Sequence, residues 1–355
     1  MAAEIMDIKI TRKAESSINE MDWDNLPFGR AFSDHMFVME YADGEWKNPE
    51  ISEYADLKLS PATSVLHYGQ SFFEGMKAYK TSDGDVQLFR PEENAKRFNA
   101  SARRMCMPEV PIDLFVESLK TLIDVDRDWI PNKDGFSLYV RPFMIATDPY
   151  VGIKPSDTYK FIIFTCPVGA YYSEPVKVKI ETEYSRAVEG GTGFAKAAGN
   201  YAGALYPAMK AQEKGYRQLI WTDAVEHKYI EEAGTMNVIF QIGDTLITPK
   251  SSDTILAGIT RRSVIDIARD WGYKVEERKV LVSEVIEAIE SGNLVEAFGA
   301  GTAATIAQIS LVHFNGVDYE LPPVENRVFS NKVKQEMENI KYGKIEDRFN
   351  WMLKV

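Results

Sequence analysis

The chain has 355 residues, with 41 basic and 53 acidic side chains and a formal net charge of −12 at pH 7. Hydrophobic residues make up 45% and charged residues 26%, which is typical of a folded globular protein and excludes a disordered one. The acidic balance, without a Lys/Arg-rich run, argues against a partner made of nucleic acid or anionic lipid. The apolar runs are strand-sized, so we expect no membrane span, and the length favours roughly two domains.

The cysteines and histidines predict neither a disulfide framework nor a metal site. Cys106 and Cys166 lack CxxC spacing, and the four histidines form no HxH or HExxH pattern. The N-terminal residues do not read as a secretory signal. We therefore expect a cytoplasmic protein without a metal.

The first half of the chain is predicted to be an α+β domain. The pair Asp43-Gly44 indicates a hairpin, Gly84 lies in a second turn, and Pro91 marks the start of a helix. The later elements predicted in this half are a helix beginning at 114–120 and strands at 136–143 and 159–164.

The second half is predicted to be a mixed sheet with helices, after a Gly/Pro-rich stretch at 167–175. A helix is expected over 201–214, capped by Asn200 and stopped by Gly215. Further helices are expected over 260–270 and after Ser283. The predicted domains are a smaller N-terminal one over 1–170, a linker over 171–180, and a larger C-terminal one over 181–355 that carries the lysine considered next.

Segment 189–201 contains a single lysine, Lys196, among glycines and alanines. Small neighbours allow a flat ligand to lie against the backbone and partly desolvate the amine, which suits Schiff-base chemistry. The alternative is a solvated lysine in a Gly-rich loop, and this segment alone favours that alternative.

Glu231 and Glu232 lie together at the end of a predicted strand, and a buried carboxylate there could hold a protonated ring nitrogen. Adjacent residues of a strand point to opposite faces, so we expect at least one of the two to be solvated. The pattern does not decide which.

Two small-residue turns could bind an anion. Gly258 precedes a predicted helix, so the amides of Ile259 and Thr260 would form a site favoured by the helix dipole. Segment 298–304 could add amides and a hydroxyl. Ordinary helix capping and a tight connection between strands are the alternatives.

Taken together, these blocks resemble the branched-chain amino-acid aminotransferases, which are fold-type IV enzymes that use pyridoxal 5'-phosphate. The resemblance runs from about residue 25 to 343 and is carried by LHY at 66–68, FEGMKA at 73–78, FRP at 89–91, YVRP at 139–142, GNY at 199–201, EAGTMN at 232–237 and GTA at 301–303. It implies a two-domain fold that combines α+β and α/β parts, the fold of D-amino-acid aminotransferases.

The resemblance also implies roles for individual residues in cofactor binding. Lys196 would link covalently to the cofactor and move the proton between the substrate and the cofactor. Glu232 would pair with the pyridine nitrogen, Tyr201 would bind the ring 3-oxygen, Arg97 would reach the phosphate, and Leu256 would pack on the ring. The remaining cofactor contacts implied are those of Gly258, Ile259, Thr260 and Thr302.

The activity implied is transfer of the amino group of L-leucine, L-isoleucine or L-valine to 2-oxoglutarate by a ping-pong mechanism, the last step of branched-chain amino-acid synthesis and the first of its degradation. The amides of Thr235 and Ala303 would hold the α-carboxylate, and Arg141 would receive the side-chain carboxylate of glutamate. The substrate pocket implied consists of Tyr68, Phe73, Tyr139, Arg141, Tyr171, Thr235 and Ala303.

Family members are homodimers. Loop 148–155 contains the prolines, glycine and apolar residues expected of a lid over the neighbouring subunit's pocket.

The CxxC of some animal members is replaced here by Ala304 and Ala307, which indicates the bacterial type. A D-amino-acid aminotransferase or an aminodeoxychorismate lyase is the nearest alternative. A non-catalytic relative is a further alternative, and the joint presence of Lys196, Tyr201, Glu232 and Arg97 argues against it.

Overall fold

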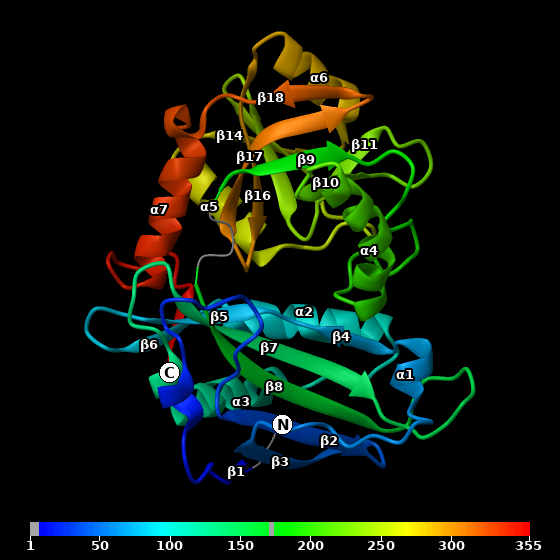
Figure 1. The fold of residues 1–355 in the computed structure, drawn as a ribbon, viewed down its shortest axis with the longest axis vertical. Coiled ribbons are helices and arrows are strands. Elements are labelled where there is room, and N and C mark those ends of the chain that lie inside the picture. The colour runs from blue at the N-terminus through cyan, green and yellow to red at the C-terminus, as the bar shows by residue number, and fades with distance from the viewer. Residues whose placement is uncertain (1–6, 170–173) are drawn as a thin grey trace. The chain divides into compact units, whose positions relative to one another are not determined.

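A computed structural model of the chain describes residues 7–169 and 174–355. It contains two compact units (Figure 1): Met1–Tyr171, Ala195–Gly199 and Glu338–Val355 form the first, and Tyr172–Phe194 and Asn200–Met337 form the second. This division differs from the predicted domains, because the segment that contains Lys196 belongs to the first unit. Residues 176–180, predicted as linker, form strand β9 (Val176–Ile180), since their alternating Val and Ile side chains are buried in a sheet.

The first unit is built on a nine-stranded sheet in the order β1-β3-β2-β8-β7-β5-β6-β19, with β4 paired to β7. Its strands are β1 (Lys9–Ile10), β2 (His35–Ala42), β3 (Glu45–Glu53), β4 (Ser71–Phe73), β5 (Met76–Lys80), β6 (Val86–Phe89), β7 (Ser137–Ala146), β8 (Tyr159–Val168) and β19 (Met352–Lys354). The predicted hairpin at Asp43-Gly44 is confirmed: both residues have positive φ and join β2 to β3.

Three helices accompany this sheet: α1 (Ser64–Tyr68), α2 (Pro91–Arg104) and α3 (Ile112–Val125). The predicted start of α2 at Pro91 is confirmed. Phe98 of α2 contacts Phe115 of α3 and Phe161 of β8, with ring centroids 5.2 Å apart in each pair. These rings belong to the core of the first unit, so α2 and α3 are fixed against the sheet by aromatic packing.

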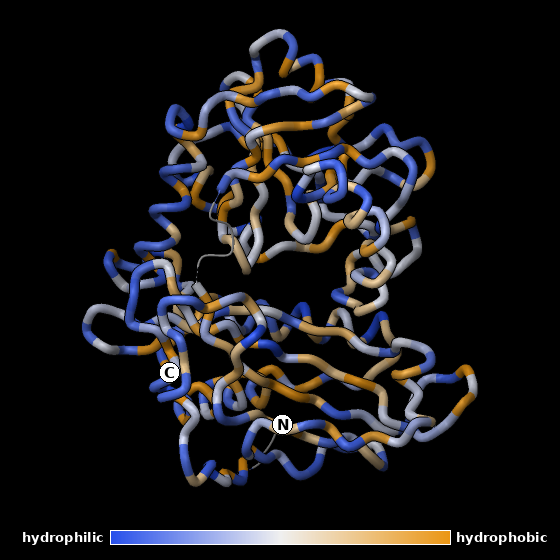
Figure 2. The backbone as a smooth tube through the Cα atoms, viewed as in Figure 1, coloured by the Kyte–Doolittle hydropathy of each residue, from blue (hydrophilic) through white to orange (hydrophobic). Residues whose placement is uncertain are grey.

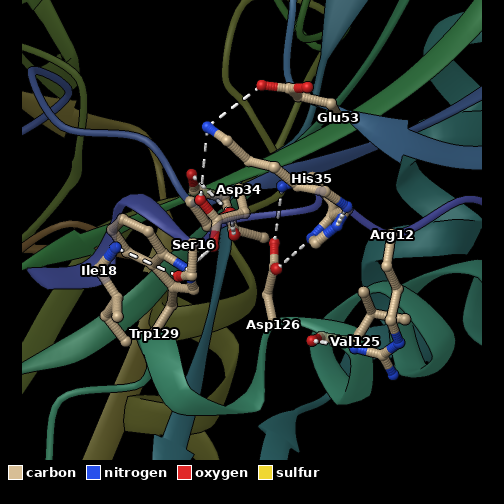
Figure 3. Close-up of polar contacts among 12 residues, drawn as sticks. Arg12, Ser16, Ile18, Asp34, His35, Glu53, Val125, Asp126 and Trp129 are labelled. Atoms are coloured by element: carbon tan, nitrogen blue, oxygen red, sulfur yellow. Dashed lines mark hydrogen bonds and ion pairs between the residues drawn. The ribbon is translucent and has the colours of Figure 1, made fainter.

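A buried polar cluster ties the N-terminal segment to the first unit (Figure 3). His35 Nδ1 lies 2.6 Å from Asp126 Oδ1, and His35 Nε2 accepts a hydrogen bond of 2.8 Å from the Lys13 amide. The Asp34 carboxylate accepts from Ser16 Oγ and Trp129 Nε1. Because the main chain occupies Nε2, His35 holds structure and is not placed to act as a general base.

The second unit is built on a ten-stranded sheet in the order β14-β13-β12-β16-β17-β9-β10-β11-β15, with β18 paired to β17. Besides β9 its strands are β10 (Gln218–Thr222), β11 (Tyr229–Ala233), β12 (Asn237–Ile242), β13 (Thr245–Pro249), β14 (Lys274–Arg278), β15 (Val280–Leu281), β16 (Leu294–Gly301), β17 (Thr305–Phe314) and β18 (Val317–Glu320). Figure 2 shows hydrophobic stretches along the strands of each unit. In the second unit, buried side chains such as those of Phe240 and Val285 pack together into a hydrophobic core.

The remaining helices are α4 (Ala198–Glu213), α5 (Ile259–Asp270), α6 (Val282–Glu290) and α7 (Phe329–Lys341). The prediction that Asn200 caps α4 is wrong, because the helix already includes this residue. Its side-chain amide instead donates to the Thr192 carbonyl at 2.8 Å, which closes the Gly-rich loop onto the helix. Among the described residues, no helix is long and apolar enough to cross a membrane.

Candidate active site

Lys196 lies in the first unit, held by its main chain between β4 and α2. Its carbonyl accepts a hydrogen bond of 3.2 Å from the Phe73 amide, and its own amide donates to Ser101 Oγ at 3.0 Å. Ala197 forms a β-bridge with Phe72. The side chain is half-buried, with Nζ 4.6 Å from the centroid of the Phe73 ring. The amine is therefore set against an aromatic face, not extended freely from a loop.

Arg97 is oriented by a fully buried carboxylate, Glu74, immediately after β4. Arg97 Nε and Nη2 donate to the two Glu74 oxygens at 2.6 and 2.8 Å, and Asn94 Nδ2 donates at 2.8 Å. Burial raises the pKa of the Glu74 carboxyl, but Arg97 and then Lys196 favour its charged form and the net pKa is lowered. The bidentate pair fixes the direction of the guanidinium.

Phe73, Tyr139 and Arg141 form an aromatic and cationic wall in the same unit. The Arg141 guanidinium carbon lies 4.4 Å from the centroid of the Phe73 ring, and Arg141 Nη2 donates to the Tyr139 hydroxyl at 3.1 Å. A Cβ at Gly75 would overlap that hydroxyl, so the glycine permits the approach of the ring. The structure thus brings together these three side chains of the predicted substrate pocket.

Glu232 is the buried carboxylate of the second unit that points toward α5. Its Oε1 accepts a hydrogen bond of 2.5 Å from the Leu256 amide, and Asn237 Nδ2 lies at 3.5 Å. Arg186 Nε is 3.3 Å from Glu232 Oε2. A guanidinium and a main-chain amide thus face one buried carboxylate.

The first turn of α5 offers its amides beside Glu232. Gly258 is the N-cap residue, and Ile259 and Thr260 are the first, buried residues of the helix. A Cβ at Gly258 would overlap Oδ1 of Asn237, so only glycine allows this close packing. The twelve-residue helix directs its positive dipole end at this point.

The other predicted site residues lie on turns and helix ends. Tyr201 is on α4, and Tyr68 is the exposed last residue of α1. Thr235 is exposed in the turn between β11 and β12, while Thr302 and Ala303 are in the turn between β16 and β17. Tyr171, also predicted for the substrate pocket, lies outside the described residues.

The expectation that Glu231 or Glu232 is solvated is wrong, since their exposed fractions are 6% and 4%. Both faces of β11 are covered in this unit. The pKa of the Glu231 carboxyl is raised to about 7, mainly by burial. The charges of Glu232 and Asp223 add to this rise, whereas a hydrogen bond from Thr254 and the charge of Arg186 oppose it.

The partners Glu74 and Arg186 were not predicted from the sequence. Glu74 lies in a quoted motif, whereas no local pattern marks Arg186.

Comparison with known proteins shows the family of the chain. The family model for Amino-transferase class IV matches residues 71–312. A branched-chain-amino-acid aminotransferase 2 of Bacillus subtilis is 47% identical over 99% of this chain and 96% of its own length. The chain belongs to the branched-chain aminotransferases of class IV.

Solved structures support the fold of this aminotransferase. The Escherichia coli branched-chain amino acid aminotransferase superposes with a TM-score of 0.73 and 26% identity over 90% of this chain and 98% of that one. The T.th. enzyme, solved with pyridoxamine 5'-phosphate, gives a TM-score of 0.72 at 24% identity over 89% and 97%. The predicted fold-type IV architecture is therefore confirmed. Among the described residues, no group of three or more His, Cys, Asp or Glu side chains could hold a metal ion.

Proposed function

We propose that this aminotransferase exchanges amino groups between L-leucine, L-isoleucine or L-valine and 2-oxoglutarate by a ping-pong cycle, with pyridoxal 5'-phosphate as its cofactor. The observation that carries the proposal is the combination of Lys196 on an aromatic face with Glu232 facing Arg186. The proposed location of the enzyme is the cytoplasm, where its two free cysteines would stay reduced.

The residues present fit pyridoxal phosphate. A buried carboxylate at Glu232 suits a protonated pyridine nitrogen, and the first amides of α5 suit a phosphate. Gly258 allows the backbone to approach closely. When bound, the cofactor supplies an electron sink that stabilises negative charge developing at the substrate Cα.

The roles of the side chains follow from this fit. Lys196 Nζ would hold the cofactor and would carry the proton to and from the substrate Cα. Tyr201 would donate to the ring oxygen, and Leu256 would pack on the ring. Arg97, oriented by Glu74, binds the phosphate together with Gly258, Ile259, Thr260 and Thr302.

One pocket serves both substrates in this proposal. Phe73 and Tyr139 give an apolar wall, where burial of an aliphatic side chain contributes about 1.5–3 kcal/mol. Arg141, stacked over Phe73, receives the side-chain carboxylate of glutamate. The amides of Thr235 and Ala303 bind the α-carboxylate, and Tyr68 completes the wall.

A homodimer is the proposed assembly, and exposed apolar side chains in each unit support it. Asp148 accepts hydrogen bonds from Asp157 and Thr158, which closes the base of loop 148–155. Ile153 at its tip is 93% exposed, and Leu205 on α4 is 70% exposed. Such side chains suit burial against a second copy, so light scattering of the active enzyme should give a dimer, and a fully active monomer would contradict this.

Borohydride trapping tests the cofactor assignment. Reduction of the holoenzyme should add the pyridoxyl mass to the peptide that contains Lys196 and to no other lysine peptide. Lys196→Ala should keep the protein folded but reduce turnover by orders of magnitude. A parallel panel of L- and D-amino acids with 2-oxoglutarate tests the substrate class, and a preference for D-amino acids would favour a D-amino-acid aminotransferase.

The dual use of the pocket is tested by Arg141→Gln. Single-turnover absorbance changes should show a loss of about ten- to a hundredfold in the glutamate half-reaction, and a much smaller loss with leucine, because one charge-assisted hydrogen bond is removed. Equal losses would show that Arg141 only braces Tyr139.

A further inference from the structure

The second unit contains a cavity of about 360 Å³ that includes none of the residues proposed for cofactor or substrate. Its volume is within the range of small-molecule sites. The cavity is lined by side chains of segment 188–189, the turn 223–226, β11, the turn 249–255 and the end of β14. Its walls are mainly apolar, with Val188, Val225, Ile230 and Ile255 among them.

Glu231 is the buried carboxylate of this cavity. Successive residues of β11 point to opposite faces, so Glu231 faces away from the side on which Glu232 meets Leu256. Among the residues that the structure describes, Glu231 Oε2 has no hydrogen-bond partner, although the side chain is only 6% exposed. A buried acceptor without a donor is costly, and such groups normally have a ligand, water or protein partner.

The other charged groups around the cavity are already engaged or lie at its mouth. The Asp223 carboxylate accepts four main-chain amides, from Val225 to Tyr229, and Arg278 pairs with Glu276 and Glu284. Lys279 Nζ lies 4.9 Å from the Tyr229 ring centroid. Glu189 and Lys250 are exposed. Thr254 donates to the Glu231 carboxylate and Arg186 lies near it, but Oε2 has no hydrogen-bond donor among the described residues. The walls beside this acidic group are mainly apolar.

We propose that this cavity is a second ligand site, which binds a small organic ammonium ion with a short aliphatic group. Because Oε2 is buried, the Glu231 side chain has to turn toward the cavity on binding. The N–H of the cation then donates to the carboxylate and supplies the hydrogen bond that the protein does not. The aliphatic group is buried against Val188 and Ile255. Above about pH 7, where Glu231 is ionised, a neutral ligand would leave its charge uncompensated and an anion would be repelled by it.

Calorimetric titration of the holoenzyme with N,N-dimethylisobutylammonium tests the site. A tertiary amine cannot form an imine, so it does not react with the cofactor. We expect saturable 1:1 binding with a dissociation constant of about a millimolar, as suits so small a ligand. Isobutyl methyl ether, which is neutral and has no N–H, should not bind.

Two variants decide whether Glu231 is responsible. Glu231→Gln should weaken binding of the ammonium probe at least about tenfold, because the charge-assisted hydrogen bond is lost. Glu189→Gln, at the exposed edge of the same cavity, is the matched control and should bind as the wild type does. If Glu231→Gln does not fold, Val225→Trp, which narrows the mouth, should abolish binding. No saturation with the wild type, equal affinity in Glu231→Gln, or equal binding of the ether would each overturn the proposal.

Discussion

The two units treat a buried carboxylate in opposite ways. In the first, Glu74 is fully buried, yet its oxygens are held by Arg97 and Asn94 and its pKa is lowered. In the second, Glu231 is almost as deeply buried, Oε2 lacks a donor among the described residues, and its pKa is raised to about 7. A bidentate guanidinium thus outweighs burial and keeps the Glu74 carboxylate charged, whereas burial without such a partner favours the neutral form of Glu231.

The largest effect on stability should come from breaking the buried ion pair between Glu74 and Arg97. Glu74→Gln removes one partner of a buried ion pair and leaves the Arg97 charge uncompensated, so the free energy of unfolding should fall by about 3–5 kcal/mol. Urea denaturation measures the change. Lys96→Gln, which removes the exposed partner of Glu93 on the same helix, should change the stability by less than about 0.5 kcal/mol. Equal effects would refute the contrast.

An intermediate effect should follow from making Glu232 resemble Glu231. Arg186→Met removes the cation at 3.3 Å from Glu232 Oε2, so this buried carboxylate loses the guanidinium that faces it. If Glu232 holds the cofactor nitrogen, kcat/KM for leucine should fall about ten- to a hundredfold. Arg269→Met, at an exposed ion pair with Glu277, is the control. Unchanged activity in Arg186→Met would contradict the role of this arginine.

The smallest effect concerns the pH dependence of Glu231. Its folded-state pKa is above the unfolded value, so the stability that it contributes is present below about pH 4.5 and is lost as pH rises through about 7. Glu231→Gln does not ionise, so its stability relative to the wild type should increase between pH 5 and pH 8, by up to about 2 kcal/mol. Thermal melts at both pH values measure this, and a pH-independent difference would contradict it.

Residue preferences for turns and helix ends correctly predicted those features of the fold that depend on neighbouring residues in the sequence. The Asp43-Gly44 turn and the start of α2 at Pro91 are set by backbone preferences of those residues. The family motifs led to Arg97 and Glu232. The pairing of Arg186 with Glu232 and the burial of Glu231 could not be predicted, because they depend on segments that come together only in the folded second unit.

The same limit applies to segment 195–199. Its composition marks a small-residue loop, but its place beside β4 depends on the hydrogen bonds of Phe73 and Ser101 to Lys196. Likewise Asn200 has the residue type of a helix cap, yet its contact with Thr192 leaves it inside α4. Residue type proposes a local role, and tertiary contacts decide it.

Strand β19, formed by Met352–Lys354, pairs with β6 at the edge of the first sheet. During synthesis on the ribosome, the first unit is therefore the last to be finished, because its edge strand is translated after the whole second unit. Until then the backbone groups of β6 on that edge have no strand to pair with, and an open edge invites association between nascent chains. Removal of the codons for Met352–Lys354 would thus harm the part of the protein that is encoded first.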